Sequence, residues 1–293
     1  MNKRSAFFAY LLSLIPFTQI IQIKYIPIFV GSAIISFESK KINAENIDYY
    51  ANRSMKRAGF GDINGAISDL DKVIEMNPRY LNAYYNRGNL KSRIGDYSGA
   101  ILDLNEAIKI TPYLSYAFFL RGVCKKKIKD FSGALEDYNK AIEYDSLFVN
   151  AYINRGNLKA DLQDYTGGII DLNNALKLEP DNAMALGNRG KIKNDLKEFN
   201  EAIKDLNKAI KLNPKFTQAL YNRGRSNYFL KNYSAAIKDF KNVIDIEPNF
   251  SMAYYNIGVI RAKQNNKNDA CKNWSRGSNL GNPESKKAFM LIC

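Results

Sequence analysis

The chain has 293 residues, of which 46% are hydrophobic and 25% are charged, so it can bury a sizeable core and does not have the composition of a disordered protein. Its formal net charge of +14 favours acidic proteins, anionic lipids or nucleic acids without selecting among them, and also fits a lysine-rich solvated surface. The absence of histidine excludes Ser-His-Asp and Cys-His catalysis and histidine metal ligands. Three scattered cysteines, Cys124, Cys271 and Cys293, are too few for a structural zinc site.

The N-terminal part of the chain is strongly apolar. Residues 5–37 contain one charged residue, Lys24, and the stretch 6–23 has about the minimum length of a membrane span. Two basic residues precede it, as in a signal sequence. We expect residues 1–46 to form a membrane anchor and a short linker, which would make the protein membrane-associated. A cleaved signal peptide, with export of the remainder, and a buried N-terminal helix are the alternatives.

From residue 47 onward, small residues and prolines recur at intervals of 34 residues. Glycine occupies position 8 of six successive copies: Gly88, Gly122, Gly156, Gly190, Gly224 and Gly258. Proline occupies position 32 in five copies: Pro78, Pro112, Pro180, Pro214 and Pro248. Seven copies result, over residues 47–80, 81–114, 115–148, 149–182, 183–216, 217–250 and 251–284. A fixed period of this length indicates stacked supersecondary units.

Each copy is expected to form two helices joined by a turn. In the second copy, Ala100, Leu104 and Ala107 are spaced as the apolar stripe of a helix, and Gly95-Asp96 provides the turn before it. A residue that can cap a helix follows at position 18, and we expect it to be the N-cap of the second helix. These residues are Asn64, Ser98, Ser132, Thr166, Asn200, Ser234 and Asn268. The glycine at position 8 should lie where the two helices approach closely.

An arginine and an aspartate recur together in the repeat. Arginine occupies position 7 and aspartate position 23 in six copies, and in the seventh both change, to Ile257 and Asn273. The joint loss indicates that the two side chains pair between neighbouring helices, where a guanidinium can hold a carboxylate through two hydrogen bonds. Arginines that grip an acidic ligand are the alternative, but they would not explain why the aspartate is lost as well. The expected pairs are Arg53 with Asp69, Arg87 with Asp103, Arg121 with Asp137, Arg155 with Asp171, Arg189 with Asp205, and Arg223 with Asp239.

The C-terminal residues 283–293 are expected to form a short capping helix, because proline suits the first position of a helix. Phe289 and Leu291 are the candidates for contact with the apolar face that the seventh copy would otherwise expose. Cys271 and Cys293 lie on the two elements that would meet. In an oxidising compartment they could form a disulfide, whereas in the cytosol they would remain thiols.

The repeat resembles the tetratricopeptide repeat, with an aromatic residue at position 4, glycine at 8, an aromatic residue at 17, alanine at 20 and 27, and proline at 32. The resemblance implies an all-α fold, an α-solenoid of seven stacked helix-turn-helix units in a right-handed superhelix, flanked by the apolar N-terminal segment and the capping helix. A single unit cannot bury its apolar face, whereas a stack buries a continuous core. The resemblance also implies a concave groove lined by the first helix of each unit.

Position 6 points toward this groove in the family, and some members hold an extended peptide with a similar row of asparagines. A carboxamide offers one acceptor and two donors, which match the backbone of a peptide whatever its side chains. Here the row is interrupted only by Leu120 in the third copy. Asparagines that cap local polar groups of the framework are the alternative. The candidate groove residues are Asn52, Asn86, Asn154, Asn188, Asn222 and Asn256, with Tyr85, Phe119, Tyr221 and Tyr255 beside them at position 5.

These features predict a non-catalytic scaffold that binds extended segments of partner proteins, tethered to a membrane by its N-terminal segment and acting as an assembly factor. The alternative is a helical-repeat protein that binds RNA through its positive charge, although the charge is not concentrated at the groove positions. The chain has no recognisable constellation of catalytic residues, and no cofactor, metal ion or small-molecule substrate is expected.

Overall fold

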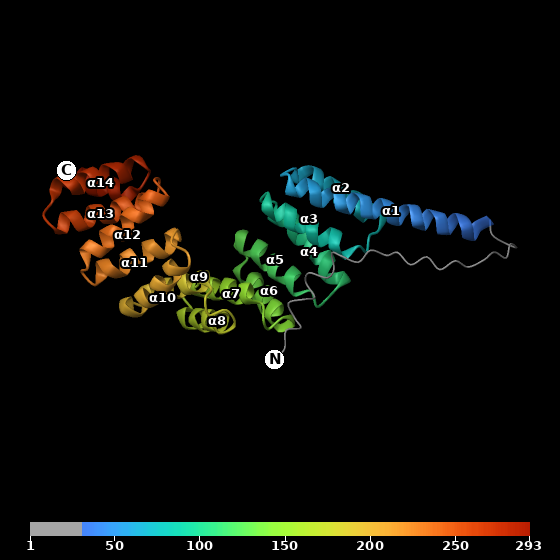
Figure 1. Ribbon diagram of the computed structural model, residues 1–293, viewed down its shortest axis with the longest axis horizontal. Helices are drawn as coiled ribbons and strands as arrows, with labels where there is room; N and C mark the ends of the chain where they lie inside the picture. The colour runs from blue at the N-terminus through green and yellow to red at the C-terminus, as the bar shows by residue number, and fades with distance from the viewer. Residues whose placement is uncertain (1–30) are drawn as a thin grey trace. The chain divides into compact units, whose positions relative to one another are not determined.

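Every element in the described part of the chain is a helix, as the spacing of the apolar residues predicts (Figure 1). The computed structural model describes the backbone of residues 31–293 and the side chains of residues 44–293. The candidate span at 6–23 therefore lies outside the described residues. Within residues 31–293, no helix combines the length and the apolar character that crossing a membrane requires.

The chain divides after Asp48, and residues 49–293 form the second of two units. Helix α1 (Gly31–Gly59) begins within the N-terminal region 1–46, whose anchor and short linker remain a prediction. From Tyr49 onward, α1 is the first helix of the first copy.

The remaining fourteen helices of the described region belong to the second unit. They are α2 (Ile63–Met76), α3 (Leu81–Arg93), α4 (Tyr97–Ile110), α5 (Ser115–Lys127), α6 (Phe131–Tyr144), α7 (Val149–Asp161), α8 (Tyr165–Leu178), α9 (Ala183–Asp195), α10 (Phe199–Leu212), α11 (Thr217–Phe229), α12 (Tyr233–Ile246), α13 (Ser251–Lys263), α14 (Lys267–Asn279) and α15 (Pro283–Ile292). The first helix of each copy is called its A helix and the second its B helix. From α3 to α14, each A helix packs on its own B helix, and each B helix packs on the next A helix (Figure 1). The predicted α-solenoid of stacked hairpins is confirmed.

The small residues of the repeat lie where two helices touch. Ala100 and Ala107 of α4 are fully buried. A Cβ atom added to Gly156 of α7 would lie 3.0 Å from the carbonyl oxygen of Gly168 and 3.1 Å from Cβ of Asp171 on α8. Any side chain at this position would therefore push the two helices of the hairpin apart.

The N-cap of the B helices is at position 16, and our expectation of position 18 was wrong. Asp62, Asp96, Asp130 and Asp164 each accept a hydrogen bond from the backbone N–H three residues later. A carboxylate here also faces the positive end of the helix dipole. The glycine three residues later leaves room for it, since a Cβ atom on Gly99 would lie 2.1 Å from Oδ2 of Asp96. Position 18 is already inside the helix.

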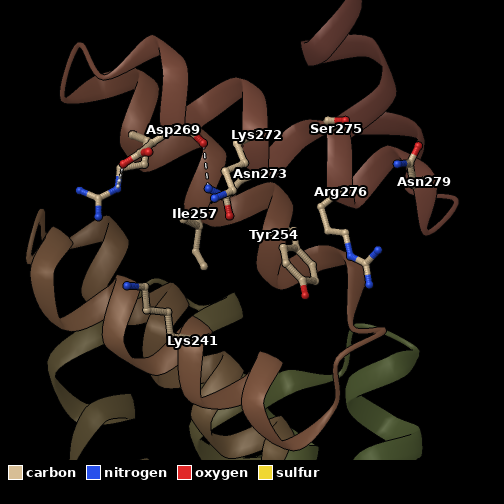
Figure 2. A pocket seen from close by; sticks show the side chains of 10 residues that line it. Lys241, Tyr254, Ile257, Asp269, Lys272, Asn273, Ser275, Arg276 and Asn279 are labelled. Carbon is tan, nitrogen blue, oxygen red and sulfur yellow. Dashed lines mark hydrogen bonds and ion pairs between the residues drawn. The ribbon is translucent and has the colours of Figure 1, made fainter.

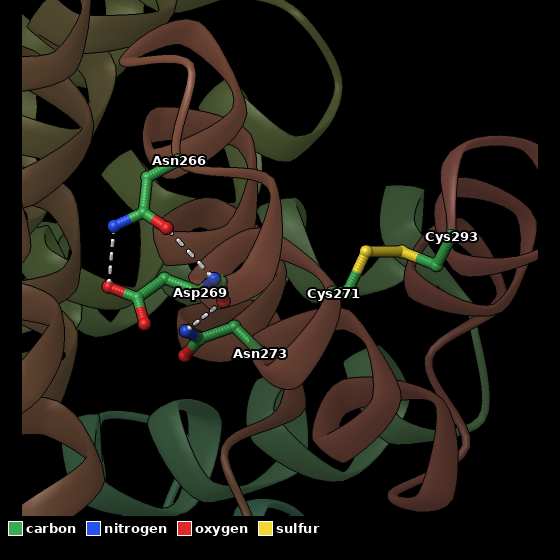
Figure 3. Close-up of a disulfide and its surroundings, with 5 residues drawn as sticks. All are labelled: Asn266, Asp269, Cys271, Asn273 and Cys293. Atoms are coloured by element: carbon green, nitrogen blue, oxygen red, sulfur yellow. Dashed lines mark hydrogen bonds between the residues drawn. A yellow bond between two sulfur atoms is a disulfide. The ribbon is translucent and has the colours of Figure 1, made fainter.

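The capping helix α15 forms as predicted, with Asn282 as its N-cap, and Cys293 at its end is bonded to Cys271 of α14 (Figure 3). The predicted contact residues were wrong, because Phe289 is 39% exposed and Leu291 is 73% exposed. The contact is made instead by small residues: Ser285 is fully buried, and its Cβ atom would lie 3.0 Å from a Cβ atom placed on Gly277 of α14. Because the small residues of α15 face α14, its large apolar side chains lie on the exposed side of the helix.

Candidate functional site

The arginine at position 7 joins three helices. Arg155 on α7 donates to the carboxylate of Asp171 on α8 from Nε (2.9 Å) and Nη2 (2.6 Å), and its Nη1 donates to Oδ1 of Asn139 on α6 (2.7 Å). The first contact closes its own hairpin, and the second ties that hairpin to the preceding one. The carboxylate contact recurs between Arg53 and Asp69, Arg87 and Asp103, Arg121 and Asp137, Arg189 and Asp205, and Arg223 and Asp239.

These ion pairs are largely withdrawn from solvent. The side chain of Asp171 is 1% exposed and that of Arg155 is 15% exposed, and Lys159, one helical turn after Arg155, lies 2.9 Å from the same carboxylate. Such a carboxylate is neutralised within the framework. The arginines therefore belong to the architecture of the repeat and are not free to grip an acidic ligand.

The pKa values of two of these groups reflect the pairing. Burial opposes ionisation of Asp205, but hydrogen bonds from Arg189 and Lys193 outweigh it and hold the pKa of the carboxyl below its usual value. Burial likewise opposes the charge of Arg87, yet its contacts with Asp103 and Asp71 outweigh burial and raise its pKa. Both shifts favour the charged forms.

Sequence reasoning missed the second partner of the arginines. This partner stands at position 25 of the preceding copy, sixteen residues before each arginine, and accepts from its Nη1 atom. The residues are Asp71, Asn105, Asn139, Asn173 and Asn207. The signal was present as a column of short acceptor side chains in the repeat. Before the seventh copy the column changes to Lys241, so arginine and both of its partners are replaced together.

The asparagines at position 6 lie along successive A helices. Asn52 is exposed, and Asn86, Asn154, Asn188 and Asn256 are half-buried. Asn256 on α13 donates from Nδ2 to the hydroxyl of Tyr221 on α11 (3.2 Å), so this position faces the neighbouring A helix. Asn154 donates to the carbonyl oxygen of Asn150 in its own helix (2.9 Å). Carboxamide groups thus remain accessible along part of the row.

Asn222 departs from the expected row, because its side chain is 2% exposed and has no surface to offer a ligand. A buried polar cluster draws α9 and α11 together around it. Asn194 donates from Nδ2 to the carbonyl oxygen of Asn222 (2.8 Å), and Ser226 donates to Oδ1 of Asn194 (2.5 Å). At position 5 of the fifth copy, Gly187 lets the ring of Phe216, just before α11, approach α9, since a Cβ atom there would lie 2.7 Å from Cε1 of that ring.

The aromatic residues at position 5 are half-buried, and two of them pack against the aromatic residue at position 34 of the same copy. The Phe119 ring lies 4.8 Å from that of Phe148, and the Tyr221 ring lies 5.1 Å from that of Phe250, measured between centroids. Burial raises the pKa of the Tyr85 and Tyr221 hydroxyls. Tyr255 is also half-buried. These rings support the stack with one face and leave their remaining surface beside the asparagine row.

Comparisons with known proteins agree with the repeat. Two models of the tetratricopeptide repeat match the chain, one over residues 183–216 and 217–250, the other over residues 81–113 and 149–182. Three of these four matches have the same bounds as copies defined by the 34-residue period. Among curated proteins, none matches the chain.

Solved structures share the fold. A tetratricopeptide repeat protein from Parabacteroides merdae ATCC 43184 is 18% identical and covers 85% of this chain and 99% of its own, with a TM-score of 0.68. MamA is 27% identical and covers 57% of this chain and 96% of its own, with a TM-score of 0.50. YrrB, described as "a TPR protein with an unusual peptide-binding site", is 20% identical and covers 63% of this chain and 95% of its own, with a TM-score of 0.51.

Proposed function

Because the chain is a tetratricopeptide repeat protein, we propose that it is a non-catalytic scaffold that binds extended segments of partner proteins along its A helices. The observation that carries this proposal is the set of partly accessible carboxamides on the A helices α3, α7, α9 and α13, at Asn86, Asn154, Asn188 and Asn256. Packed helices lie roughly 8–10 Å apart, and an extended chain advances roughly 3.3 Å per residue. Between the neighbouring A helices α7 and α9, one carboxamide would thus meet about every third residue of the ligand, and the spacing is wider where Leu120 and the buried Asn222 interrupt the row.

Several features support a peptide over other ligands. A carboxamide can donate to a peptide C=O and accept from a peptide N–H, so the row would hold a backbone with little regard to side chains. Half-buried aromatic rings at position 5 lie beside it and can anchor apolar side chains at low entropic cost. The description of YrrB shows that a protein of this fold can carry a peptide-binding site.

The proposal is tested with peptides selected for binding to the full-length chain. Each selected peptide is then titrated against a variant with Asn86→Ala, Asn154→Ala and Asn188→Ala. Loss of hydrogen bonds at these positions should weaken binding by at least about tenfold, since one net hydrogen bond contributes about 1 kcal/mol.

The matched control changes Asn64, Asn200 and Asn268 to Ala, which are exposed asparagines on B helices. This control should bind like the wild type. Equal affinity of both variants for every selected peptide would show that the row is not a binding device.

We also propose that residues 5–37 tether the scaffold to a membrane, so that bound partners are assembled or positioned at its surface. The support is the sequence alone, namely a long apolar stretch with Lys24 as its only charge. The full-length chain should co-float with phospholipid vesicles, and a chain with Leu11→Arg and Ile15→Arg should not. A full-size chain that stays in the soluble fraction would contradict the tether.

A further inference from the structure

The third and seventh copies of the repeat each have a hollow between the A-helix residues at positions 4, 7 and 11 and the B-helix residues at positions 22, 23, 25 and 26. We call it the B-side hollow. In the third copy it measures about 430 Å³. Its charges are three cations, Arg121, Lys125 and Lys140, and two carboxylates, Glu136 and Asp137. The carboxylate of Asp137 lies 2.6 Å from Arg121 and 3.0 Å from Lys125, so these two cations of the hollow are paired with a carboxylate of the same copy.

The seventh copy has the same hollow with a different lining. It measures about 520 Å³ and is bordered by helices α12, α13 and α14 (Figure 2). At the positions of Arg121, Glu136 and Asp137, four repeat lengths earlier, the seventh copy has Ile257, Lys272 and Asn273. The intramolecular arginine–aspartate pair is therefore absent, and a lysine stands where the third copy has Glu136, as it also does in the fifth and sixth copies.

This hollow has a larger excess of positive charge than that of the third copy. It is lined by four cations, Lys241, Arg261, Lys272 and Arg276, and by one carboxylate, Asp269. Asp269 lies 3.6 Å from Arg261. Lys241, Lys272 and Arg276 have no ion pair with any residue in the described part of the chain.

The cations also face a common space. Lys272 and Arg276 are one helical turn apart on α14 and so lie on one face of it, while Lys241 comes from α12 (Figure 2). Asn273, which replaces the aspartate, turns back and donates from Nδ2 to the carbonyl oxygen of Asp269 (2.8 Å). The position that holds a carboxylate in the other copies is thus occupied by a neutral group bonded to its own helix.

We propose that the B-side hollow of the seventh copy binds a carboxylate of an acidic segment from a partner protein. The incoming carboxylate would pair with Lys241, Lys272 and Arg276, which have no ion pair within the described residues, and charge-assisted hydrogen bonds of this kind are stronger than neutral ones. The volume lies within the roughly 300–1,000 Å³ range of ligand pockets. This site is separate from the asparagine row on the A helices and does not depend on peptide binding there.

The test uses the full-length chain with its disulfide intact and a fluorescein-labelled peptide of alternating glutamate and glycine, followed by fluorescence anisotropy. A peptide with glutamine in place of glutamate is the uncharged probe. The wild type should bind the glutamate peptide and not the glutamine peptide. Lys272→Glu with Asn273→Asp, which restores carboxylates at the positions of Glu136 and Asp137, should weaken binding by at least about tenfold, because it replaces a charge-assisted contact with repulsion. Arg276→Ala should weaken it several-fold while leaving the core untouched.

The matched control is Lys238→Glu, which makes the same change as Lys272→Glu at the corresponding position 22 of the sixth copy, where Arg223 and Asp239 are paired. It should bind within about twofold of the wild type, as expected for an exposed charge outside the site. Equal loss in the control would show non-specific attraction to a basic protein and would overturn the proposal. Unchanged binding by the variant with Lys272→Glu and Asn273→Asp would also overturn it. The same holds if a single-stranded oligonucleotide binds more tightly than the peptide and this variant no longer binds the oligonucleotide. Asn154→Ala with Asn188→Ala should leave this binding unchanged, which separates it from the function of the asparagine row.

Discussion

The sharpest test of the framework is to convert one intact copy into the natural combination of the seventh. Arg155→Ile and Asp171→Asn reproduce the residue types of Ile257 and Asn273. The expected loss of stability depends on whether the ion pair is exposed or buried. An exposed pair contributes about 0–1 kcal/mol, whereas removing one partner of a buried pair costs about 3–5 kcal/mol. With exposures of 1% for Asp171 and 15% for Arg155, the pair lies close to the buried class.

Each single substitution should therefore lower the free energy of unfolding by about 2–3 kcal/mol, slightly below the buried range because the guanidinium keeps some contact with water. Asp171→Asn leaves Arg155 and Lys159 without a carboxylate, and Arg155→Ile leaves a carboxylate with Lys159 alone. The double variant should cost no more than either single one, which corresponds to a coupling energy of at least about 2 kcal/mol, because neither Arg155 nor Asp171 is then left without the other.

The measurement is urea unfolding followed by far-UV circular dichroism, with thermal midpoints as a second readout. At roughly 2–4 °C per kcal/mol for a chain of this size, each single variant should melt about 4–12 °C below the wild type. Strictly additive losses, or single variants within about 0.5 kcal/mol of the wild type, would refute the account. The column of arginines would then be a surface feature without energetic coupling.

Two further outcomes follow from the packing and the charges. Gly156→Ala should destabilise the protein by about 1–3 kcal/mol, as overpacking does, because its Cβ atom would meet Gly168 and Asp171 across the hairpin. The control Gly59→Ala should not destabilise it, because a Cβ atom there meets nothing within 4 Å. Equal unfolding midpoints for the two variants would contradict the close approach at Gly156. Stability should also fall at acid pH: the pKa of Asp205 is depressed in the folded state, so its contribution is complete above the unfolded value of about 3.9 and is lost as the pH drops through the lower folded value. Asp205→Asn should reduce the difference in unfolding free energy between pH 7 and about pH 3, and an unchanged difference would show that the pair contributes nothing.

The 34-residue period was sufficient to predict the fold because every copy repeats the same contacts between its helices. Glycine at position 8 and alanine at position 20 mark the close approach, and their spacing fixes the register of both helices. The N-caps were misplaced by two residues, since both Asp96 and Ser98 can cap a helix, and only the left-handed residue at Gly95 decides where the helix begins. The pattern of residue types does not show which backbone φ angle that residue adopts.

The candidate site was less predictable for a related reason. Asn222 has the same residue type and repeat position as Asn188, but it is buried, because the polar contacts of Asn194 and Ser226 close the space between α9 and α11. Those contacts join residues of different copies and are unique to one interface. Averaging over a repeat reveals what the copies share and conceals what distinguishes a single interface.

The seventh copy has no arginine–aspartate pair at positions 7 and 23, and its hairpin is stabilised by other contacts. Position 24, which is Leu172 in the fourth copy, is Trp274 in the seventh, 2% exposed and donating from Nε1 to the carbonyl oxygen of Tyr255 on α13 (3.3 Å). A buried tryptophan removes more apolar surface from water than a leucine does, and the disulfide between Cys271 and Cys293 ties α14 to α15 covalently. With the hairpin closed by these means, position 23 no longer has to supply an arginine with a carboxylate and can carry Asn273. Beside the cations at positions 22 and 26, this release from a structural task makes a cationic hollow at the last copy compatible with a stable stack.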